Sequence, residues 1–191
     1  MIWDELKDIT FSVVDLETTG FSFEKDEILE ICVVHINNGN INNVWDSLVR
    51  PKKRVRLELT EIHGIDNDML MIAPSKPIIA AKVATLLKGT HFVEHNQNNF
   101  DSAFVENFLG HKNWAGSSNT LRLAKLINPG LKSYSLESLC KNEGIDLSKH
   151  HIAKDDALAT AKLFIKLVNK SAIELLPIEN IRTTLGIVRG K

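Results

Sequence analysis

The chain of 191 residues is 43% apolar and 25% charged, and its formal net charge at pH 7 is −1. This length and apolar content suit one compact domain with a buried core. The near-neutral charge argues against a protein that coats long stretches of nucleic-acid duplex. There is no apolar run long enough to span a membrane and no signal-peptide layout, and the two distant cysteines suit buried thiols in a reducing compartment. We therefore expect a cytoplasmic protein with no membrane partner.

The first third of the chain reads as three strands. Residues 11–16 form a mostly buried apolar run, and the acidic residues 24–27 follow as a solvated turn. Residues 28–36 are predicted to be a second strand, and residues 37–40 supply the turn of a hairpin. The return strand runs from about residue 41 to residue 49 and stops before a proline.

Helices then alternate with shorter elements. Apolar spacing predicts helices over residues 77–88 and 100–109, each followed by a glycine, with a short strand at 91–94 between them. Residues 121–127 and 135–142 are predicted to be short helices, and the apolar stripe from 158 to 168 marks a long last helix. Residues 171–191 fit either a packed helix with a frayed tail or an attachment to a partner. The order of elements predicts an α/β sandwich around a mixed sheet.

Two acidic residues stand at the end of the first strand. Asp15 and Glu17 are two residues apart, so both side chains project from the same face. Carboxylates that are held together and partly dehydrated repel each other, and a divalent cation removes that repulsion. Oxygen ligands of this kind suit Mg²⁺ or Mn²⁺. Taken alone, the pair could equally be two solvated acids at a strand end.

Residues 15–20 spell D-x-E-T-T-G, which resembles the first motif of the DnaQ-like, DEDDh family of 3′–5′ exonucleases. The resemblance implies a ribonuclease H-like fold, a mixed sheet flanked by helices, and catalysis with two divalent cations, Mg²⁺ or Mn²⁺. It covers about residues 10–170, and we expect residues 1–170 to form the exonuclease domain. Residues 171–191, a helix or tail, lie outside it.

The third family motif resembles H-x-A-x-x-D-A at residues 151–157. Among the two neighbouring histidines, only His151 has alanine two residues on and aspartate five residues on. Counting from His150 puts isoleucine at the alanine position. Five residues correspond to about 500° of helical turn, so the histidine and Asp156 cannot share a helix face. We therefore expect His151 in the loop before the last helix and Asp156 in its first turn.

The middle motif resembles H-N-x-x-F-D, and it departs from that pattern by one residue. Between His95-Asn96 and Phe100-Asp101 the chain has three residues instead of two. The addition falls where a strand turns into a helix, and a loop there can absorb one residue at small cost. We expect Asp101 still to reach the metals.

The resemblance implies a complete set of site residues. Its metal ligands are Asp15, Glu17, Asp101 and Asp156, and His151 is the general base that completes the catalytic set. It implies substrate contacts from Leu16, Thr18, Thr19, Gly20, His63, Asn96 and Phe100. The expected activity is removal of nucleoside 5′-monophosphates from the 3′ end of DNA, at single-stranded or frayed ends, in proofreading or repair. A DNA polymerase subunit is an expected partner. Two alternatives stay open: the same chemistry on RNA, and a non-catalytic module that binds nucleic-acid ends or a polymerase.

Overall fold

One mixed β-sheet organises the chain. The computed structural model describes residues 2–96, 98–147, 151–174 and 177–187. The five strands lie in the order β3-β2-β1-β4-β5. The first three pair antiparallel, and β4 and β5 continue the sheet in parallel with β1. Their bounds are β1 (Phe11–Thr18), β2 (Ile28–Asn37), β3 (Asn40–Leu48), β4 (His91–Glu94) and β5 (Gly116–Asn119).

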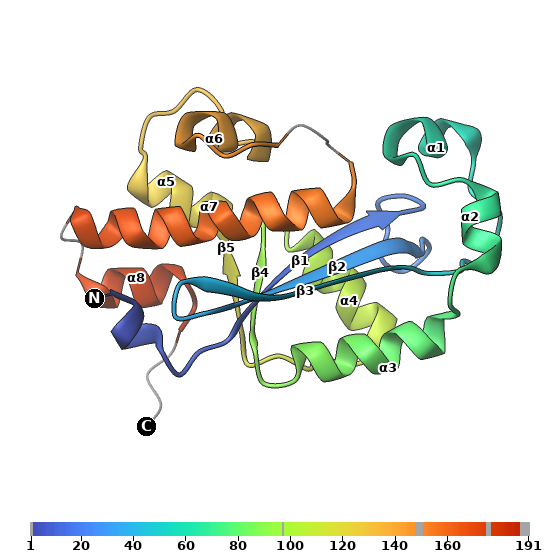
Figure 1. Cartoon of the computed structure of the whole chain (residues 1–191), viewed down its shortest axis with the longest axis horizontal. Coiled ribbons are helices and arrows are strands. Elements are labelled where there is room, and N and C mark those ends of the chain that lie inside the picture. Colours follow the sequence, from blue (N-terminus) through green and yellow to red (C-terminus); the bar gives the residue numbers. More distant parts are fainter. Residues whose placement is uncertain (1, 97, 148–150, 175–176, 188–191) are drawn as a thin grey trace.

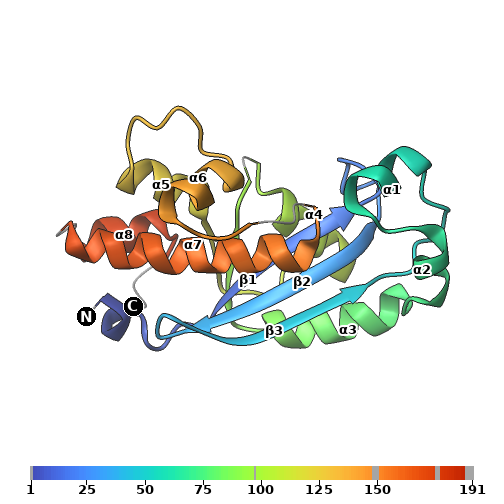
Figure 2. The ribbon, with the colours of Figure 1, turned by 45° about the horizontal axis from the view of Figure 1, so that its top comes forward.

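Helices cover both faces of this sheet (Figure 1). On one face lie α3 (Lys76–Leu87) and α4 (Phe100–Leu109). The other face is covered by α5 (Thr120–Ile127), α6 (Leu136–Glu143), α7 (Ala153–Ile173) and α8 (Ile178–Thr184). Figure 2 shows α7 running along the sheet, with α1 (Leu57–His63) and α2 (Asn67–Ile72) beyond the C-terminal ends of β1 and β3. Among the described residues, no helix is long and apolar enough to cross a bilayer.

Strand β1 is largely buried, as the sequence predicts, and it packs on both faces of the sheet. Phe11 and Val13 pack into the cluster beneath α7, whereas Val14 and Leu16 pack against α3 and α4. Side chains alternate between faces along a strand, so the next odd-numbered residues after Val13 also point to the α7 side. The fold therefore directs the acid pair of β1 toward the N-terminal end of α7.

The α/β architecture expected from the sequence is confirmed, and several short elements add to it. The 3₁₀ turn η1 (Ile2–Leu6), helices α1 and α2, and strand β5 were not expected. Helix α1 has no side-chain cap at its start, and β5 consists of Gly-Ser-Ser-Asn, which has low strand propensity. Strand β5 forms because it pairs in parallel with all four residues of β4, a long-range contact that local sequence does not encode.

The segment after α7 contains a packed helix. Ile181 and Leu185 of the α8 region are fully buried in the cluster beneath α7. The carbonyl of Leu185 accepts a hydrogen bond from Ser118 Oγ at 2.7 Å and lies 2.7 Å from His91 Nε2. These contacts attach α8 to β4 and β5. The chain end at 188–191 lies outside the described residues.

Candidate active site

Strand β1 presents the first two acids at its C-terminal end. In the antiparallel register, Asp15 lies opposite Cys32 and Glu17 lies opposite Glu30, so three carboxylates share one region of the sheet. The register shifts between Glu17 and Thr18. Such a bulge bends the strand and ends regular pairing, which is common next to active sites. The strand ends at Thr18, one residue after the second acid.

Helix α7 brings the third acid to the same place. Asp156 lies in the first turn of α7 and is 9% exposed. One oxygen each of Asp15, Glu17 and Asp156 lie within 4.8 Å of one another, which is close enough to ligate a shared cation. The start of α7 is held to the sheet, because the backbone N–H of Ala153 donates to Glu30 Oε2 at 3.0 Å.

Asp101 reaches the same cluster from the opposite helical layer. It lies in the first turn of α4 and is 6% exposed. Its Oδ2 accepts a hydrogen bond of 2.7 Å from Asn96 Nδ2. Among the neighbouring acids, Asp101 has the largest effect in raising the pKa of Asp15, ahead of Asp156 and Glu17. Asp101 is therefore next to the cluster, although it is not among the three acids whose oxygens are mutually within 4.8 Å.

Burial and mutual repulsion raise the pKa values of these acids. Burial first, and then the charge of Asp101, raises the pKa of Asp15 well above its ordinary value. Burial, and then the like charge of Glu30 on the neighbouring strand, raises the pKa of Glu17 to about 8. Burial and the charge of Glu94 raise the pKa of Asp101 to about 8. Within the described part of the chain, neither Asp15 nor Glu17 pairs with a lysine or arginine. The cluster has the electrostatics of a cation site.

His151 lies just before α7, where the motif register places it. Its backbone has φ of 64°, in the left-handed region, and its N–H donates to Asp156 Oδ2 at 3.1 Å. The side chain is exposed. A non-glycine residue in this conformation is uncommon and is often found at functional sites. The neighbouring His150 lies outside the described residues, so the choice between the two histidines stays a prediction.

His63 faces the same region from the end of α1. It is 6% exposed, and its Nδ1 accepts a hydrogen bond of 3.1 Å from the backbone of Ile65. The ring proton must then reside on Nε2, and this atom has no partner among the described residues. Burial, and then the charge of His151, lowers the pKa of His63. His63 is thus a neutral, buried donor near His151.

The loop after Glu17 is fixed by Asp26. The carboxylate of Asp26 accepts hydrogen bonds from Thr19 Oγ1 at 3.2 Å and from the backbone of Ser22 at 2.9 Å. A β-carbon on Gly20 would lie 2.5 Å from the same carboxylate, so any larger residue there would have to displace the side chain of Asp26. Thr18 Oγ1 donates to the Gly20 carbonyl at 2.7 Å. The loop is therefore already organised without substrate.

Phe100 and Leu16 complete the set of predicted substrate contacts. Phe100 begins α4, and its ring lies 4.7 Å from that of Phe104 and 6.4 Å from that of Phe21. Phe21 is 94% exposed, so an aromatic surface borders the acid cluster. Leu16 is 7% exposed, and its side chain belongs to the core beneath α3 and α4. Its backbone, between the two acids, is what could face a substrate.

Sequence reasoning missed three acids that support this site: Glu30, Glu94 and Asp26. Each makes hydrogen bonds to a segment that carries predicted site residues. A signal was present for Glu94, which is the only charged residue of the short strand β4 and is fully buried. A buried charge needs hydrogen-bond partners, so its position in an apolar strand indicates a specific role.

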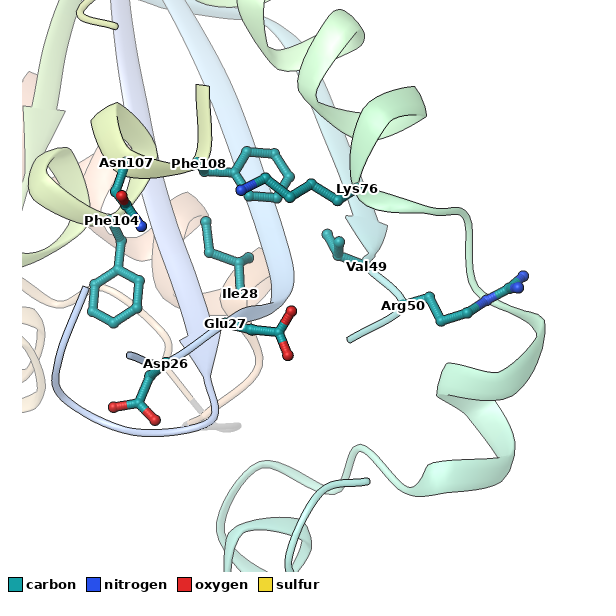
Figure 3. Close-up of a pocket in the computed structure, with 9 residues that line it drawn as sticks. All are labelled: Asp26, Glu27, Ile28, Val49, Arg50, Lys76, Phe104, Asn107 and Phe108. Atoms are coloured by element: carbon teal, nitrogen blue, oxygen red, sulfur yellow. The ribbon is translucent and has the colours of Figure 1, made fainter. Parts of the chain in front are cut away.

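A separate pocket lies between β2, α3 and α4 (Figure 3). Its lining includes Phe104, Phe108 and Lys76, and the ammonium of Lys76 lies 5.0 Å from the centre of the Phe108 ring. None of the predicted catalytic or substrate residues lines it. The chemistry expected of this chain therefore belongs to the acid cluster and not to this pocket.

Comparisons with known proteins point to one family. The family model RNase_T, described as exonuclease, matches residues 12–164. The chain is 34% identical over 171 residues to DNA polymerase III subunit epsilon of Aquifex aeolicus, covering 87% of this chain and 84% of that protein. It is 33% identical over 169 residues to DNA polymerase III PolC-type of Staphylococcus aureus. That match covers 86% of this chain but only 12% of the much longer relative.

Solved structures give the same picture. Exonuclease X in complex with 5′ overhanging duplex DNA superposes with a TM-score of 0.70 and 26% identity, covering 92% of this chain and 99% of that one. Exonuclease I of E. coli in complex with a dT13 oligonucleotide superposes with a TM-score of 0.75. Its 19% identity, over 87% of this chain and 42% of that one, bears on the fold alone.

Proposed function

The chain belongs to the exonuclease family whose model matches its residues 12–164 and is a 3′–5′ exonuclease, and we propose that it removes nucleoside 5′-monophosphates from single-stranded or frayed 3′ ends of DNA. The observation that carries this proposal is the carboxylate cluster, in which oxygens of Asp15, Glu17 and Asp156 lie within 4.8 Å of one another. The role is proofreading or repair, in keeping with the similarity to a polymerase III epsilon subunit.

Four acids would hold two divalent cations: Asp15, Glu17, Asp101 and Asp156. The fit rests on the donor set, which is all carboxylate oxygen, and on the raised pKa values of three of these acids. Such donors suit Mg²⁺ or Mn²⁺, whereas Zn²⁺ prefers histidine and cysteine. When bound, the cations favour ionisation of the attacking water and stabilise charge on the leaving 3′ oxygen.

The remaining residues move the proton and hold the strand. His151 accepts the proton of the attacking water, a task for which imidazole is suited near neutral pH. The hydrogen bond from its backbone N–H to Asp156 keeps His151 beside the acids. His63 offers a buried N–H for which the terminal nucleotide would supply an acceptor. The ring of Phe100 and the pre-organised loop after β1 would contact that nucleotide, with contributions from Leu16, Thr18, Thr19, Gly20 and Asn96.

We extend the proposal to partner and compartment. A DNA polymerase subunit is the expected partner, because the relative with 34% identity is itself a polymerase III subunit. A cytoplasmic location suits Cys32 and Cys140, which are buried free thiols.

The test is a release assay on matched, 3′-labelled DNA and RNA strands, with and without Mn²⁺. We expect labelled mononucleotide from DNA only when metal is present, and no release by Asp15→Ala. Faster release from RNA would replace DNA with RNA as the substrate. Absence of release from both strands, by folded protein saturated with Mn²⁺, would leave a non-catalytic end-binding module as the explanation.

A further inference from the structure

Glu94 is a completely buried acid that the proposed mechanism does not use. It ends strand β4, is 0% exposed, and is two residues before Asn96 in the middle motif. Three donors satisfy its carboxylate: Asn96 Nδ2 at 2.9 Å, the backbone N–H of Ser102 at 3.1 Å, and Ser102 Oγ at 3.0 Å. Burial of a carboxylate is costly unless it is hydrogen-bonded in this way. Protein donors therefore take up three of the roughly four acceptor positions of this carboxylate.

The helix that carries Asp101 begins without a normal cap. The residue before α4, Asn99, has φ of 53° and ψ of 43°, and its side chain caps nothing. A usual N-cap residue has extended backbone, and its side chain accepts from the second or third helical N–H. Asn99 has left-handed backbone instead, and its side chain does not make this arrangement.

Glu94 and Asn96 replace the missing cap from outside the helix. Asn96 Oδ1 accepts from the N–H of Phe100 at 3.0 Å, the first residue of α4. Glu94 Oε2 accepts from the N–H of Ser102, the third residue. A negative charge at a helix N-terminus is also favourable. The first turn of α4 is therefore attached to the end of β4 on both sides of Asp101.

The same network fixes the direction of the Asp101 carboxylate. Asn96 Nδ2 donates to Glu94 Oε2 at 2.9 Å and to Asp101 Oδ2 at 2.7 Å, so its two protons serve one acid each. Because Asn96 Oδ1 is also engaged, a flipped amide would set its oxygen against both carboxylates. The orientation of this amide, and with it that of Asp101, depends on the acceptor that Glu94 provides.

We infer that Glu94 is a positioning residue for the metal ligand Asp101, acting through Asn96 and the first turn of α4. The inference rests on the proposed function, since it assumes that Asp101 binds a divalent cation. Residues that orient metal ligands by hydrogen bonds commonly change metal affinity by about 10–100-fold when replaced. Loss of the Glu94 acceptor is therefore expected to weaken metal binding without removing any ligand.

The test compares two substitutions of similar size. Glu94→Met removes both acceptor oxygens, so one N–H of the Asn96 amide and the backbone N–H of Ser102 lose their partner. The hydroxyl of Ser102 can still donate to the carbonyl of Asn99 at 3.1 Å. Glu94→Gln keeps an oxygen for both N–H donors and places an amide where Ser102 Oγ can accept. Ser135→Ala is the control, because it removes an N-cap from α6 away from the acids. Mn²⁺ binding to the whole chain is measured by titration calorimetry, and thermal unfolding is measured without metal.

We expect Glu94→Met to weaken Mn²⁺ binding about 10–100-fold, and Glu94→Gln to stay within about threefold of wild type. Both Glu94→Met and Ser135→Ala should lower the melting temperature, but only the first should lower Mn²⁺ affinity. A Glu94→Met protein that is destabilised yet binds Mn²⁺ normally would overturn the inference, because the role would then be structural only. Equal, large losses for Met and Gln would overturn the hydrogen-bonding account.

Two further results keep the test decisive. If Glu94→Met does not fold, Ser102→Ala removes one of the three donors to Glu94, and an Mn²⁺ affinity equal to that of wild type would then count against the inference. If wild-type protein binds no Mn²⁺ and releases no nucleotide, the proposed function itself fails. Wild-type activity with an unaffected Glu94→Met variant would instead reject only the positioning role.

Discussion

Cation binding at this site should release protons, and the number can be worked out from the acids. With pKa values of about 8, Glu17 and Asp101 are each about nine-tenths protonated at pH 7. The pKa of Asp15 is raised in the same direction. Ligands must be deprotonated to bind metal. From Glu17 and Asp101 we therefore expect Mn²⁺ binding at pH 7 to release about two protons, shared among the interacting acids.

Titration calorimetry in buffers of different ionisation enthalpy measures this number directly. The number of protons released should fall steeply by pH 9, because the same acids are mostly ionised there before the metal binds. Glu30→Gln is the matched variant, because it removes the charge opposite Glu17 but keeps an acceptor for the N–H of Ala153. It should lower the pKa of Glu17 and reduce proton release at pH 7, with a smaller difference at pH 6. Release of less than about half a proton at pH 7 would refute the reasoning.

The same raised pKa values set the sign of a stability change. The folded, metal-free protein binds these protons more tightly than the unfolded chain does, so its stability falls as pH rises. The fall should span the window from the ordinary carboxyl pKa near 4 up to about 8. Saturating Mn²⁺ should reverse it. Thermal unfolding across this range checks the sign, and a metal-free protein that becomes steadily more stable from pH 5 to 8 would contradict it.

Four other outcomes follow from the site and the fold. Asp156→Asn should abolish nucleotide release while the circular dichroism spectrum stays unchanged. EDTA should abolish release by the wild-type protein, and Mg²⁺ or Mn²⁺ should restore it, whereas Zn²⁺ should not. His151→Ala should slow release about 10²–10⁴-fold with Mn²⁺ affinity retained; a near wild-type rate would remove it as the base. Leu185→Ala should cost about 2–5 kcal/mol in urea unfolding, because Leu185 is fully buried where α8 meets the sheet.

Much of the fold was predictable because it depends on local periodicity. The apolar residues of β1 indicated a mostly buried strand, and the period of two placed Asp15 and Glu17 on one side of it. The helical spacing of α4 and α7 was equally clear. The alternation of side chains along β1 did not reveal which layer of helices the two acids face. That depends on tertiary packing, in which the odd-numbered residues of β1 lie beneath α7. That choice brings Asp156 within reach.

Contacts between distant segments account for what the sequence did not reveal. Glu30 lies opposite Glu17 only because of the antiparallel register, and it reaches Ala153, 123 residues away, only after α7 has packed. Strand β5 depends on pairing with β4, since Gly-Ser-Ser-Asn has no strand signal of its own. The predicted roles of His63 and Asn96 came from the family resemblance. Their hydrogen-bonding states required coordinates: the His63 donor has no partner among the described residues, and the Asn96 amide bonds to Glu94, Asp101 and Phe100.

The two helices that carry Asp101 and Asp156 are both capped at their N-termini by an acid from the sheet. Neither α4 nor α7 has a side-chain N-cap of its own, and each has a backbone N–H in its first turn bound by an acid from a strand. Glu94 of β4 serves α4, and Glu30 of β2 serves α7. A cap within the loop would fix only the helix end, whereas a cap from the sheet also fixes the helix relative to β1, where Asp15 and Glu17 lie. This explains how α4 can tolerate an extra residue before it. The loop length changes the path of the chain, but the hydrogen bonds from the sheet still determine where Asp101 lies.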